Sequence, residues 1–312
     1  MLITSSILGV SINNIIITWR FIEINLLSFI PLITFRKYFN PHIIGLKYFL
    51  IQSLGSIFLL VSILIILISE KNNFFNLFFV FRLLWKIGVP PFHFWLFSLI
   101  IELNWLLFFI LSSWQKILPL YLINKIYFNL WDYIIILRLI ICVVGVMFQS
   151  RIKKLIIFSS IFTSSWIISS IIFFKIIWTL LLGIYRLILF FLIIFLSNRR
   201  LLIKESENYF FITQIEKFYI FFILLRIAGI PPFLGFFIKI SVLFILLLYK
   251  KFIISFILVV SSIIILFIYR RIFLNRLRGL NSINKIIFSY KNFNLFFFRT
   301  IFFIGPIIFL IF

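Results

Sequence analysis

The chain has 312 residues, of which 64% are hydrophobic and only 12% are charged, and its formal net charge is +23. Water-soluble domains carry about 25% charged residues, so this composition excludes a soluble fold and indicates a polytopic membrane protein. The excess of basic residues then belongs to loops that set the topology and contact anionic lipid, and we do not expect nucleic-acid binding.

The apolar runs predict transmembrane α-helices rather than barrel strands, because they are continuous over roughly 17–25 residues instead of alternating over about ten. We expect about eleven spans, here in chain order: residues 2–18, 19–35, 43–69, 74–89 followed by a re-entrant piece over 92–104, 105–124, 130–149, 155–174, 176–196, 218–249, 252–269 and 295–312. No linker rich in Gly or Ser separates them, so residues 1–312 are expected to form a single transmembrane domain.

The basic residues of the loops predict the orientation of these spans. When loops are assigned alternately to the two sides, most of their Lys and Arg residues fall on one side, which includes the N-terminus. The positive-inside rule places that side in the cytoplasm-like compartment and, with an odd number of spans, the C-terminus opposite. The N-terminus lacks the pattern of a cleavable signal, so its apolar run is expected to remain as a helix.

Several charged residues are predicted to lie inside spans, where they are costly. They are Glu23, Arg82, Lys86, Glu102, Lys116, Asp132, Arg138, Arg186, Arg226 and Lys239. Asp132 is near a helix start and Glu102 is close to an interface, so both are expected to be structural. Arg138 and Arg186 are expected to snorkel or to pair with a neighbour. No role is assigned to Arg82.

Three of these residues lie a few positions from a proline that is predicted to break a helix: Lys86, Lys116 and Lys239. Broken helices free carbonyl groups within the membrane and are the usual place for ion sites in transporters. A partly desolvated lysine at such a break can accept and release a proton, and a nearby carboxylate would switch it between these states. Glu23 is the candidate carboxylate. The alternative is that these lysines only pair with acids and hold helices together.

A short internal repeat accompanies two of the breaks. Ile87-Gly-Val-Pro-Pro-Phe92 and Ala228-Gly-Ile-Pro-Pro-Phe233 share Gly, Pro, Pro and Phe at the same offsets, which is typical of transporters built from two halves. His93 follows the first break and either joins a proton path or anchors the chain at the interface; both remain open. Two distant histidines and the single Cys142 do not make a metal site.

Five stretches, with a weaker sixth, carry a resemblance to a known family: residues 19–31, 47–52, 86–95, 114–119, 229–239 and, more weakly, 151–160. Through them the chain resembles the subunit 2 family of mitochondrial NADH:ubiquinone oxidoreductase (respiratory complex I), whose members are antiporter-like. It departs from the family pattern at Phe97-Ser98, where a Pro-Glu pair is usual, and at Arg226 and Ile238.

The resemblance implies a proton-translocating subunit of the membrane arm, with two inverted five-helix repeats that each contain a broken helix. The proton-transfer residues of the family correspond to Glu23, Lys86, Lys116 and Lys239. No cofactor is implied in this chain, because other subunits of the complex bind NADH, FMN, iron–sulfur clusters and ubiquinone.

The implied partners are the other membrane-arm subunits, including neighbouring antiporter-like subunits, together with anionic lipid such as cardiolipin. The implied location is the mitochondrial inner membrane, with the N-terminus on the matrix side and the C-terminus on the intermembrane-space side. Two alternatives stay open: a stand-alone cation/proton antiporter, and a structural spacer of the arm that pumps nothing.

Overall fold

The computed structural model describes residues 1–35, 41–68, 73–125, 131–149, 152–173, 177–198, 214–231 and 233–278. The regular elements in these residues are all helical: α1 (Leu2–Ser11), α2 (Ile15–Thr34), α3 (Pro41–Ile68), α4 (Asn73–Ile87), α5 (Phe94–Glu102), α6 (Trp105–Phe109), the π-helix η1 (Ile110–Trp114), α7 (Ile117–Asn124), α8 (Trp131–Met147), α9 (Ile152–Phe173), α10 (Ile177–Asn198), α11 (Gln214–Ala228), α12 (Leu234–Leu248) and α13 (Phe252–Arg278). The predicted all-α class is confirmed.

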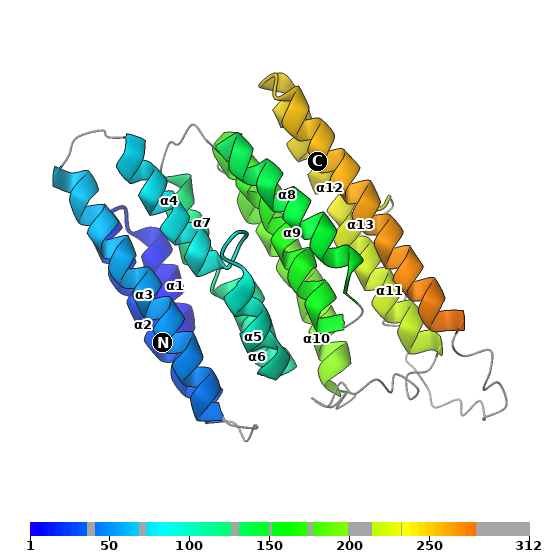
Figure 1. The fold of residues 1–312 in the computed structure, drawn as a ribbon, viewed down its shortest axis with the longest axis horizontal. Coiled ribbons are helices and arrows are strands. Elements are labelled where there is room, and N and C mark those ends of the chain that lie inside the picture. The colour runs from blue at the N-terminus through cyan, green and yellow to red at the C-terminus, as the bar shows by residue number, and fades with distance from the viewer. Residues whose placement is uncertain are drawn as a thin grey trace.

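The helices stand side by side in an extended row (Figure 1). The N-terminal helices α1 to α3 occupy one end, α8 to α10 the middle, and α11 to α13 the other end. Six helical stretches among the described residues are long and apolar enough to cross a membrane, and shorter apolar helices accompany them. The chain is therefore a multi-pass membrane protein.

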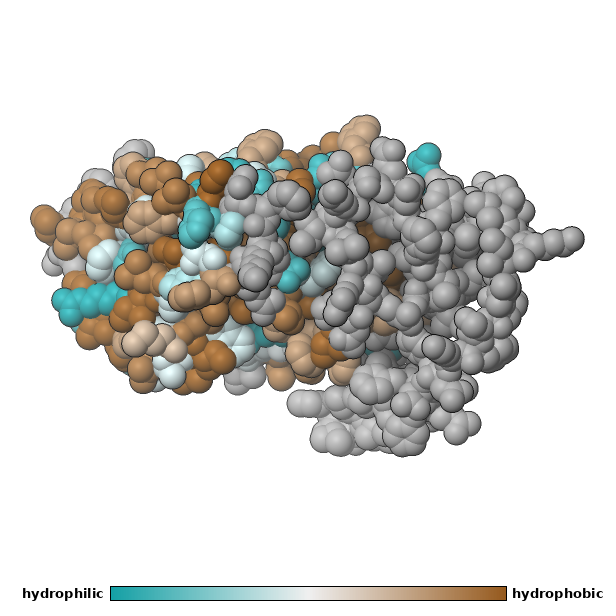
Figure 2. All heavy atoms as spheres, turned by 90° about the horizontal axis from the view of Figure 1, so that it is seen from below, coloured by the Kyte–Doolittle hydropathy of each residue, from teal (hydrophilic) through white to brown (hydrophobic). Residues whose placement is uncertain are grey.

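Many exposed side chains of the described residues are large and apolar, as a lipid-facing surface requires. In the view from below in Figure 2, brown, hydrophobic residues dominate the coloured part, and teal, hydrophilic residues are scattered among them. Along α13, the exposed side chains include Phe252, Phe256, Ile263 and Phe267, which recur at helical spacing. Such a stripe would be an aggregation liability in water but is the expected contact with acyl chains.

Helix α9 lies at the centre of the bundle and packs against α5, α7, α8, α10, α11 and α12. Its membrane window is 94% buried, compared with 39% for the window of the neighbouring α10. Many of its buried residues are nevertheless Ser or Thr, and their hydroxyls donate to carbonyls one turn earlier in the same helix; Ser164, for example, donates to the carbonyl of Ile161. These bonds satisfy the hydroxyls without a partner helix, so a polar helix can be buried.

Two predicted boundaries are wrong. The first predicted span, residues 2–18, ends at Ser11 as α1, because Asn14 caps α2: its side chain accepts the N–H of Ile16 at 3.0 Å. A ten-residue helix is about 15 Å long, which is half the hydrocarbon thickness. The helix predicted over 252–269 continues through Arg278. The predicted span 295–312 lies outside the described residues.

Candidate functional site

Two helices are broken where the internal repeat predicts it. α4 ends at Ile87 and α5 begins at Phe94, while α11 ends at Ala228 and α12 begins at Leu234. At both breaks the repeated glycine has a positive φ, 70° at Gly88 and 81° at the equivalent glycine of the second break. Left-handed backbone of this kind is readily adopted only by glycine, which explains why the residue recurs.

The hydrogen bonds of the two breaks follow one pattern. In each, the glycine and the residue after it donate to the same carbonyl of the last helical turn, and the Phe that closes the motif donates to the carbonyl three residues before it. The bonds of the first break are Gly88 to Leu84 (3.0 Å), Val89 to Leu84 (3.1 Å) and Phe92 to Val89 (2.8 Å), and those of the second are Gly229 to Leu225 (3.0 Å), Ile230 to Leu225 (3.4 Å) and Phe233 to Ile230 (2.9 Å). The sequence repeat is therefore also a structural repeat.

Lys239, on α12, reaches back to the end of α11. Its Nζ donates to the carbonyls of Ile227 at 3.0 Å and Ala228 at 2.5 Å, which the break has freed. The ammonium also lies 4.9 Å from the ring of Phe162 and 5.4 Å from that of Trp166. Helix-end carbonyls and aromatic faces both favour a cation, so this buried site is suited to a protonated lysine.

Lys86, on the last turn of α4, has a different environment. Its side chain is only 7% exposed, and its Nζ has no hydrogen-bond partner within the described residues. Glu23 on α2, the predicted partner, is half-buried; it interacts electrostatically with Lys86 but makes no direct ion pair with it. The expected pairing is thus electrostatic and not a contact.

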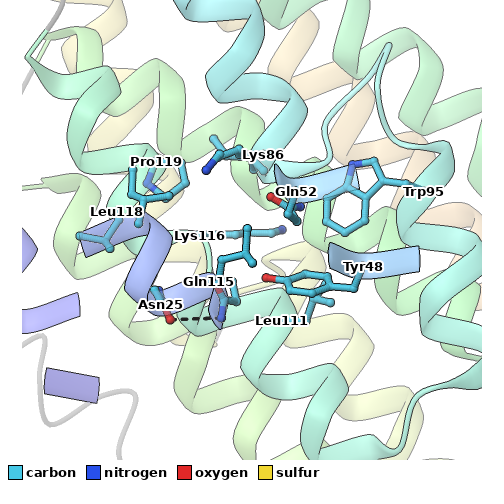
Figure 3. A pocket seen from close by; sticks show the side chains of 13 residues that line it. Asn25, Tyr48, Gln52, Lys86, Trp95, Leu111, Gln115, Lys116, Leu118 and Pro119 are labelled. Carbon is cyan, nitrogen blue, oxygen red and sulfur yellow. Dashed lines mark hydrogen bonds between the residues drawn. The ribbon is translucent and has the colours of Figure 1, made fainter. Parts of the chain in front are cut away.

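A polar cavity separates Lys86 from Lys116 (Figure 3). Its volume is about 20 Å³, and about 10–15 Å³ is enough to hold one water molecule. Four other polar side chains also line it: Asn25 on α2, Tyr48 and Gln52 on α3, and Gln115, which donates to Asn25 at 3.2 Å. The cavity offers enough partners for a water that connects the two lysines.

Lys116 follows the π-helix η1 and directly precedes α7, and it is 6% exposed. We predicted that Pro119 breaks this span, but Pro119 sits inside the first turn of α7, where proline is tolerated. The irregularity is instead the π-helix, a feature frequent at functional sites. The Nζ of Lys116 donates to the carbonyl of Ser160 on α9 at 3.4 Å, a long bond.

Polar groups surround α9 between Lys116 and Lys239. Successive residues of a helix are about 100° apart, so Lys116, which contacts Ser160, and Lys239, which contacts the rings of Phe162 and Trp166, approach different sides of α9. Two buried tyrosines occupy the arc between them: Tyr185 of α10 beside Ser160 and Thr163, and Tyr269 of α13 beside Ser159. Neither tyrosine hydroxyl has a well-formed hydrogen bond within the described residues.

Of the two alternatives predicted for Arg138 on α8, snorkelling and contact with a neighbour, the structure shows the second. Arg138 is fully buried, with 0% exposure, because its side chain points from α8 towards α9. One guanidinium nitrogen, Nη2, donates to Ser164 Oγ at 2.6 Å. Its Nε and Nη1 have no partner within the described part of the chain.

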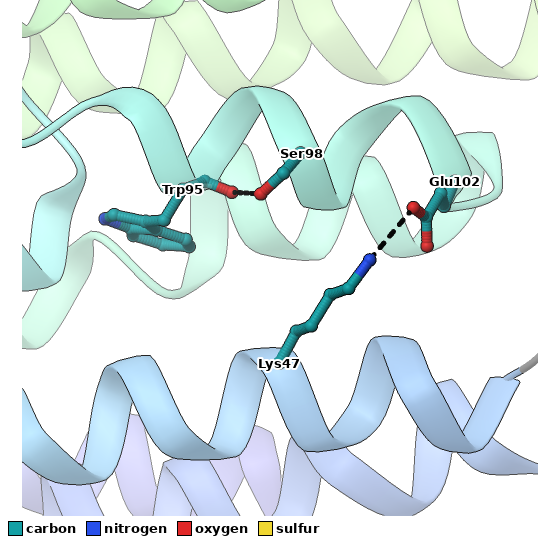
Figure 4. A network of polar contacts seen from close by, with 4 residues as sticks. All are labelled: Lys47, Trp95, Ser98 and Glu102. Carbon is teal, nitrogen blue, oxygen red and sulfur yellow. Dashed lines mark hydrogen bonds and ion pairs between the residues drawn. The ribbon is translucent and has the colours of Figure 1, made fainter.

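The acidic residues predicted to be structural do form ion pairs near helix ends. Lys47 of α3 pairs with Glu102 at the end of α5 at 3.3 Å (Figure 4), and Lys251 pairs with Asp132 at 2.6 Å. All four side chains are between 29% and 44% exposed. These pairs connect neighbouring helices at the edge of the apolar region and lie away from the cavity.

Aromatic rings accompany the remaining intramembrane arginines. The guanidinium of Arg82 lies 4.0 Å from the ring of Phe58 and 4.5 Å from that of Phe78, which provides the physical account missing at the level of sequence. Arg186 lies 5.4 Å from the Trp114 ring, and Arg226 lies 5.3 Å from that of Phe233. Cation–π contacts compensate part of the cost of desolvating these charges.

Trp95 and His93 both lie at the first break, and Trp95 also lines the cavity between the lysines. The indole N–H of Trp95 donates to the carbonyl of Trp85 at 3.1 Å, so it satisfies a carbonyl at the end of α4. His93 is buried, stacks on Phe94, and lies 3.3 Å from the carbonyl of Pro91 through its Nδ1. Its role stays a prediction.

Several polar residues of the site were missed at the level of sequence. Amides inside apolar spans, such as Asn25 and Gln52, are as unusual as charges and would have signalled the cavity. Tyr185 and Tyr269 carry no such signal, because tyrosines are common wherever a span meets the membrane interface.

A known family model and named proteins from other organisms are similar to this chain. The family model described as NADH:quinone oxidoreductase/Mrp antiporter, TM matches residues 12–265. The NADH-ubiquinone oxidoreductase chain 2 of Anopheles gambiae is 35% identical over 245 residues, covering 76% of this chain and 72% of that protein. The protein of the same name from Artemia franciscana is 36% identical over 237 residues, covering 75% of each.

Two solved structures share the fold. Respiratory complex I from Thermus thermophilus with bound aureothin contains a chain with a TM-score of 0.73 at 16% identity, covering 88% of this chain and 69% of that one. The Mrp complex from Dietzia sp. DQ12-45-1b matches with a TM-score of 0.68 at 19% identity, covering 83% and 56%. The predicted antiporter-like fold is confirmed.

Proposed function

The chain belongs to the family of NADH:quinone oxidoreductase and Mrp antiporter transmembrane subunits, and from this membership we propose that it translocates protons in the membrane arm of an NADH:ubiquinone oxidoreductase. The relatives that carry the name NADH-ubiquinone oxidoreductase chain 2 support the assignment to that complex. The neighbours in solved structures belong to multi-subunit membrane complexes, so this chain is expected to work within one.

The observation that carries the proposal is the polar cavity shared by Lys86 and Lys116. Two buried amines with room for one water between them can exchange a proton without either leaving its helix. In a spacer that only packs helices, an unpartnered Lys86 facing such a space would lower the stability of the fold without serving a function, since an unsatisfied buried charge is destabilising.

In the proposed path a proton resides near Glu23 and Lys86, crosses the cavity to Lys116, and passes around α9 to Lys239. The hydroxyls of Tyr185 and Tyr269 are the groups on α10 and α13 that face this arc. The carbonyls of Ile227 and Ala228 receive the ammonium at its end.

The driving energy must come from outside this chain. Moving one charge across 100 mV costs about 2.3 kcal/mol, so the proton affinity of each lysine has to change by a comparable free energy during the cycle. We place NADH, FMN, iron–sulfur clusters and ubiquinone in other subunits. The single Cys142 of the whole sequence cannot supply the four thiolates of a typical cluster.

We infer that the chain resides in the mitochondrial inner membrane, with its N-terminus on the matrix side and its C-terminus on the intermembrane-space side. The names of the relatives and the basic loops support this placement. We also infer that neighbouring membrane-arm subunits and anionic lipid such as cardiolipin contact the apolar surface.

The test replaces Lys86 or Lys239 with Met in the assembled complex and measures the ratio of protons pumped to electrons transferred. Both variants should lower that ratio, because Met preserves volume but holds no proton. Lys47→Met is the matched control: it removes a lysine from a half-exposed ion pair and should leave the ratio unchanged.

Two outcomes would contradict the proposal. An unchanged ratio in both the Lys86 and Lys239 variants would make the chain a non-pumping spacer. Purification of the native chain as a stand-alone carrier, without flavin and iron–sulfur partners, would make it a cation/proton antiporter.

A further inference from the structure

Arg138 carries a buried charge that the proposed path does not use. Its guanidinium has no exposure, one hydrogen bond to Ser164 Oγ, and two nitrogens without partners within the described residues. A guanidinium stays protonated in proteins, so this is a permanent positive charge. The two ion pairs described above join Glu102 to Lys47 and Asp132 to Lys251, so neither acid is paired with Arg138.

The position of this charge is set by α9. Lys116 donates to the carbonyl of Ser160, and Arg138 donates to the hydroxyl of Ser164, four residues later. Residues four apart lie on the same face of a helix, one turn of about 5.4 Å from each other. The two cations are therefore neighbours on one side of α9, and they interact electrostatically.

The three lysines consequently differ in how well their surroundings support a cation. Glu23 interacts with Lys86, and two carbonyls and two aromatic rings face Lys239. Lys116 has one bond of 3.4 Å and the like charge of Arg138. Lys116 therefore differs from Lys86 and Lys239 in having a neighbouring like charge, which disfavours its protonated form.

We propose that Arg138 is a positioning residue for proton transfer, a fixed charge that keeps Lys116 from retaining a proton and so separates the Glu23–Lys86 half of the path from the Lys239 half. The inference rests on the proposed function. Protons then cross Lys116 only while the rest of the complex raises the energy of the proton at Lys86. At rest, the membrane potential cannot drive protons backward through the chain.

The expected effect follows from Coulomb's law. Two unit charges roughly 6–8 Å apart, at an effective dielectric constant of about 20, change a protonation equilibrium by about 30- to 100-fold. Arg138→Gln removes this repulsion, and Lys116 becomes a site that a proton can occupy in the resting state. Arg138→Lys keeps a positive charge and is the matched control.

The experiment reconstitutes the assembled complex into liposomes and applies a potassium diffusion potential without NADH, while a dye inside reports proton entry. Arg138→Gln should raise this passive proton flux at least about fivefold, a fraction of the electrostatic effect. Arg138→Lys should retain the wild-type flux. Wild-type flux in the Gln variant would overturn the proposal, because removing the charge would then have no effect on the flux. Equal leaks in the Gln and Lys variants would also overturn it, because the leak would then come from altered packing and not from the lost charge.

A second pair of variants decides the matter if the Gln variant does not assemble. Ser164→Asp leaves Arg138 in place but puts a carboxylate against its guanidinium, and Ser164→Asn has the same shape without the charge. The Asp variant should leak and the Asn variant should not. Equal fluxes in the two would overturn the proposal.

Failure of this inference is distinguishable from failure of the proposed function. If Lys116→Met lowers the proton-to-electron ratio but Arg138→Gln does not leak, the path stands and the role of Arg138 is wrong. Adding Lys116→Met to Arg138→Gln should abolish the extra leak, since the charge acts through Lys116. A leak that persists in the double variant would also overturn the inference.

Discussion

Replacing Gly229 with Ala should disable Lys239 without touching the lysine itself. Gly229 has a φ of 81°, which an L side chain rarely adopts. A Cβ at this position would lie 2.8 Å from Cδ, 3.0 Å from Nζ and 3.1 Å from Cε of Lys239. The lysine side chain must move aside, and its ammonium then leaves at least one of the two carbonyls that bind it.

The magnitude has two parts. Left-handed backbone costs an L residue about 1–2 kcal/mol, which lowers the stability of the break. A hydrogen bond to a charged group contributes about 1.5–3 kcal/mol, so losing one carbonyl makes protonated Lys239 about 10- to 150-fold less stable. We therefore expect the pumping rate to fall about tenfold or more.

The assay compares NADH-driven proton uptake by liposomes that contain equal amounts of assembled complex. Gly183→Ala is the control, because a Cβ at Gly183 has no heavy atom within 4 Å and glycine is the poorer helix former. The control should pump normally. A Gly229→Ala complex that assembles and pumps at the wild-type rate would refute the view that the break carbonyls hold the proton at Lys239.

Three further predictions concern the packing around α9 and the helix ends. Tyr185→Phe should slow proton transfer around α9 several-fold at unchanged assembly, whereas Tyr133→Phe, which changes a residue that is 70% exposed, should not. Equal pumping rates in the two variants would contradict a role of the Tyr185 hydroxyl in proton transfer. Glu102→Gln should change stability by less than about 1 kcal/mol and leave pumping intact, because its ion pair is half-exposed. Gly145→Ala should destabilise the α8–α9 contact by about 1–3 kcal/mol, since the new Cβ would overlap the Phe158 ring, and the yield of thermally stable complex should fall accordingly.

The helix breaks were predictable from sequence because their cause is local. Gly-x-Pro-Pro removes backbone donors and requires a left-handed residue whatever surrounds it, so the breaks at Gly88 and Gly229 lie where the motif is. The helix ends were less predictable, because hydropathy does not report helix capping. Asn14, for example, caps the start of α2 within an apolar run. The basic tail of α13, which ends at Arg278, continues as helix beyond its apolar window.

The site was only partly predictable, because its electrostatics depend on which faces meet. Lys86 and Lys239 could be selected from their neighbouring prolines. The full burial of Arg138 could not, since the same residue on another face of α8 would have reached the membrane surface. Lys116 was selected for the wrong reason, because a π-helix leaves no proline signature.

The two breaks share their backbone but not the donor that occupies them. In the first, the neutral indole of Trp95 takes the carbonyl of Trp85; in the second, the ammonium of Lys239 takes the carbonyls of Ile227 and Ala228. The same backbone break thus accepts a neutral donor in one half and a charged donor in the other. The lysine proposed to hold a proton in the first half, Lys86, lies before its break, whereas Lys239 lies after the second break, so the two halves place their amines on opposite sides of a common backbone feature.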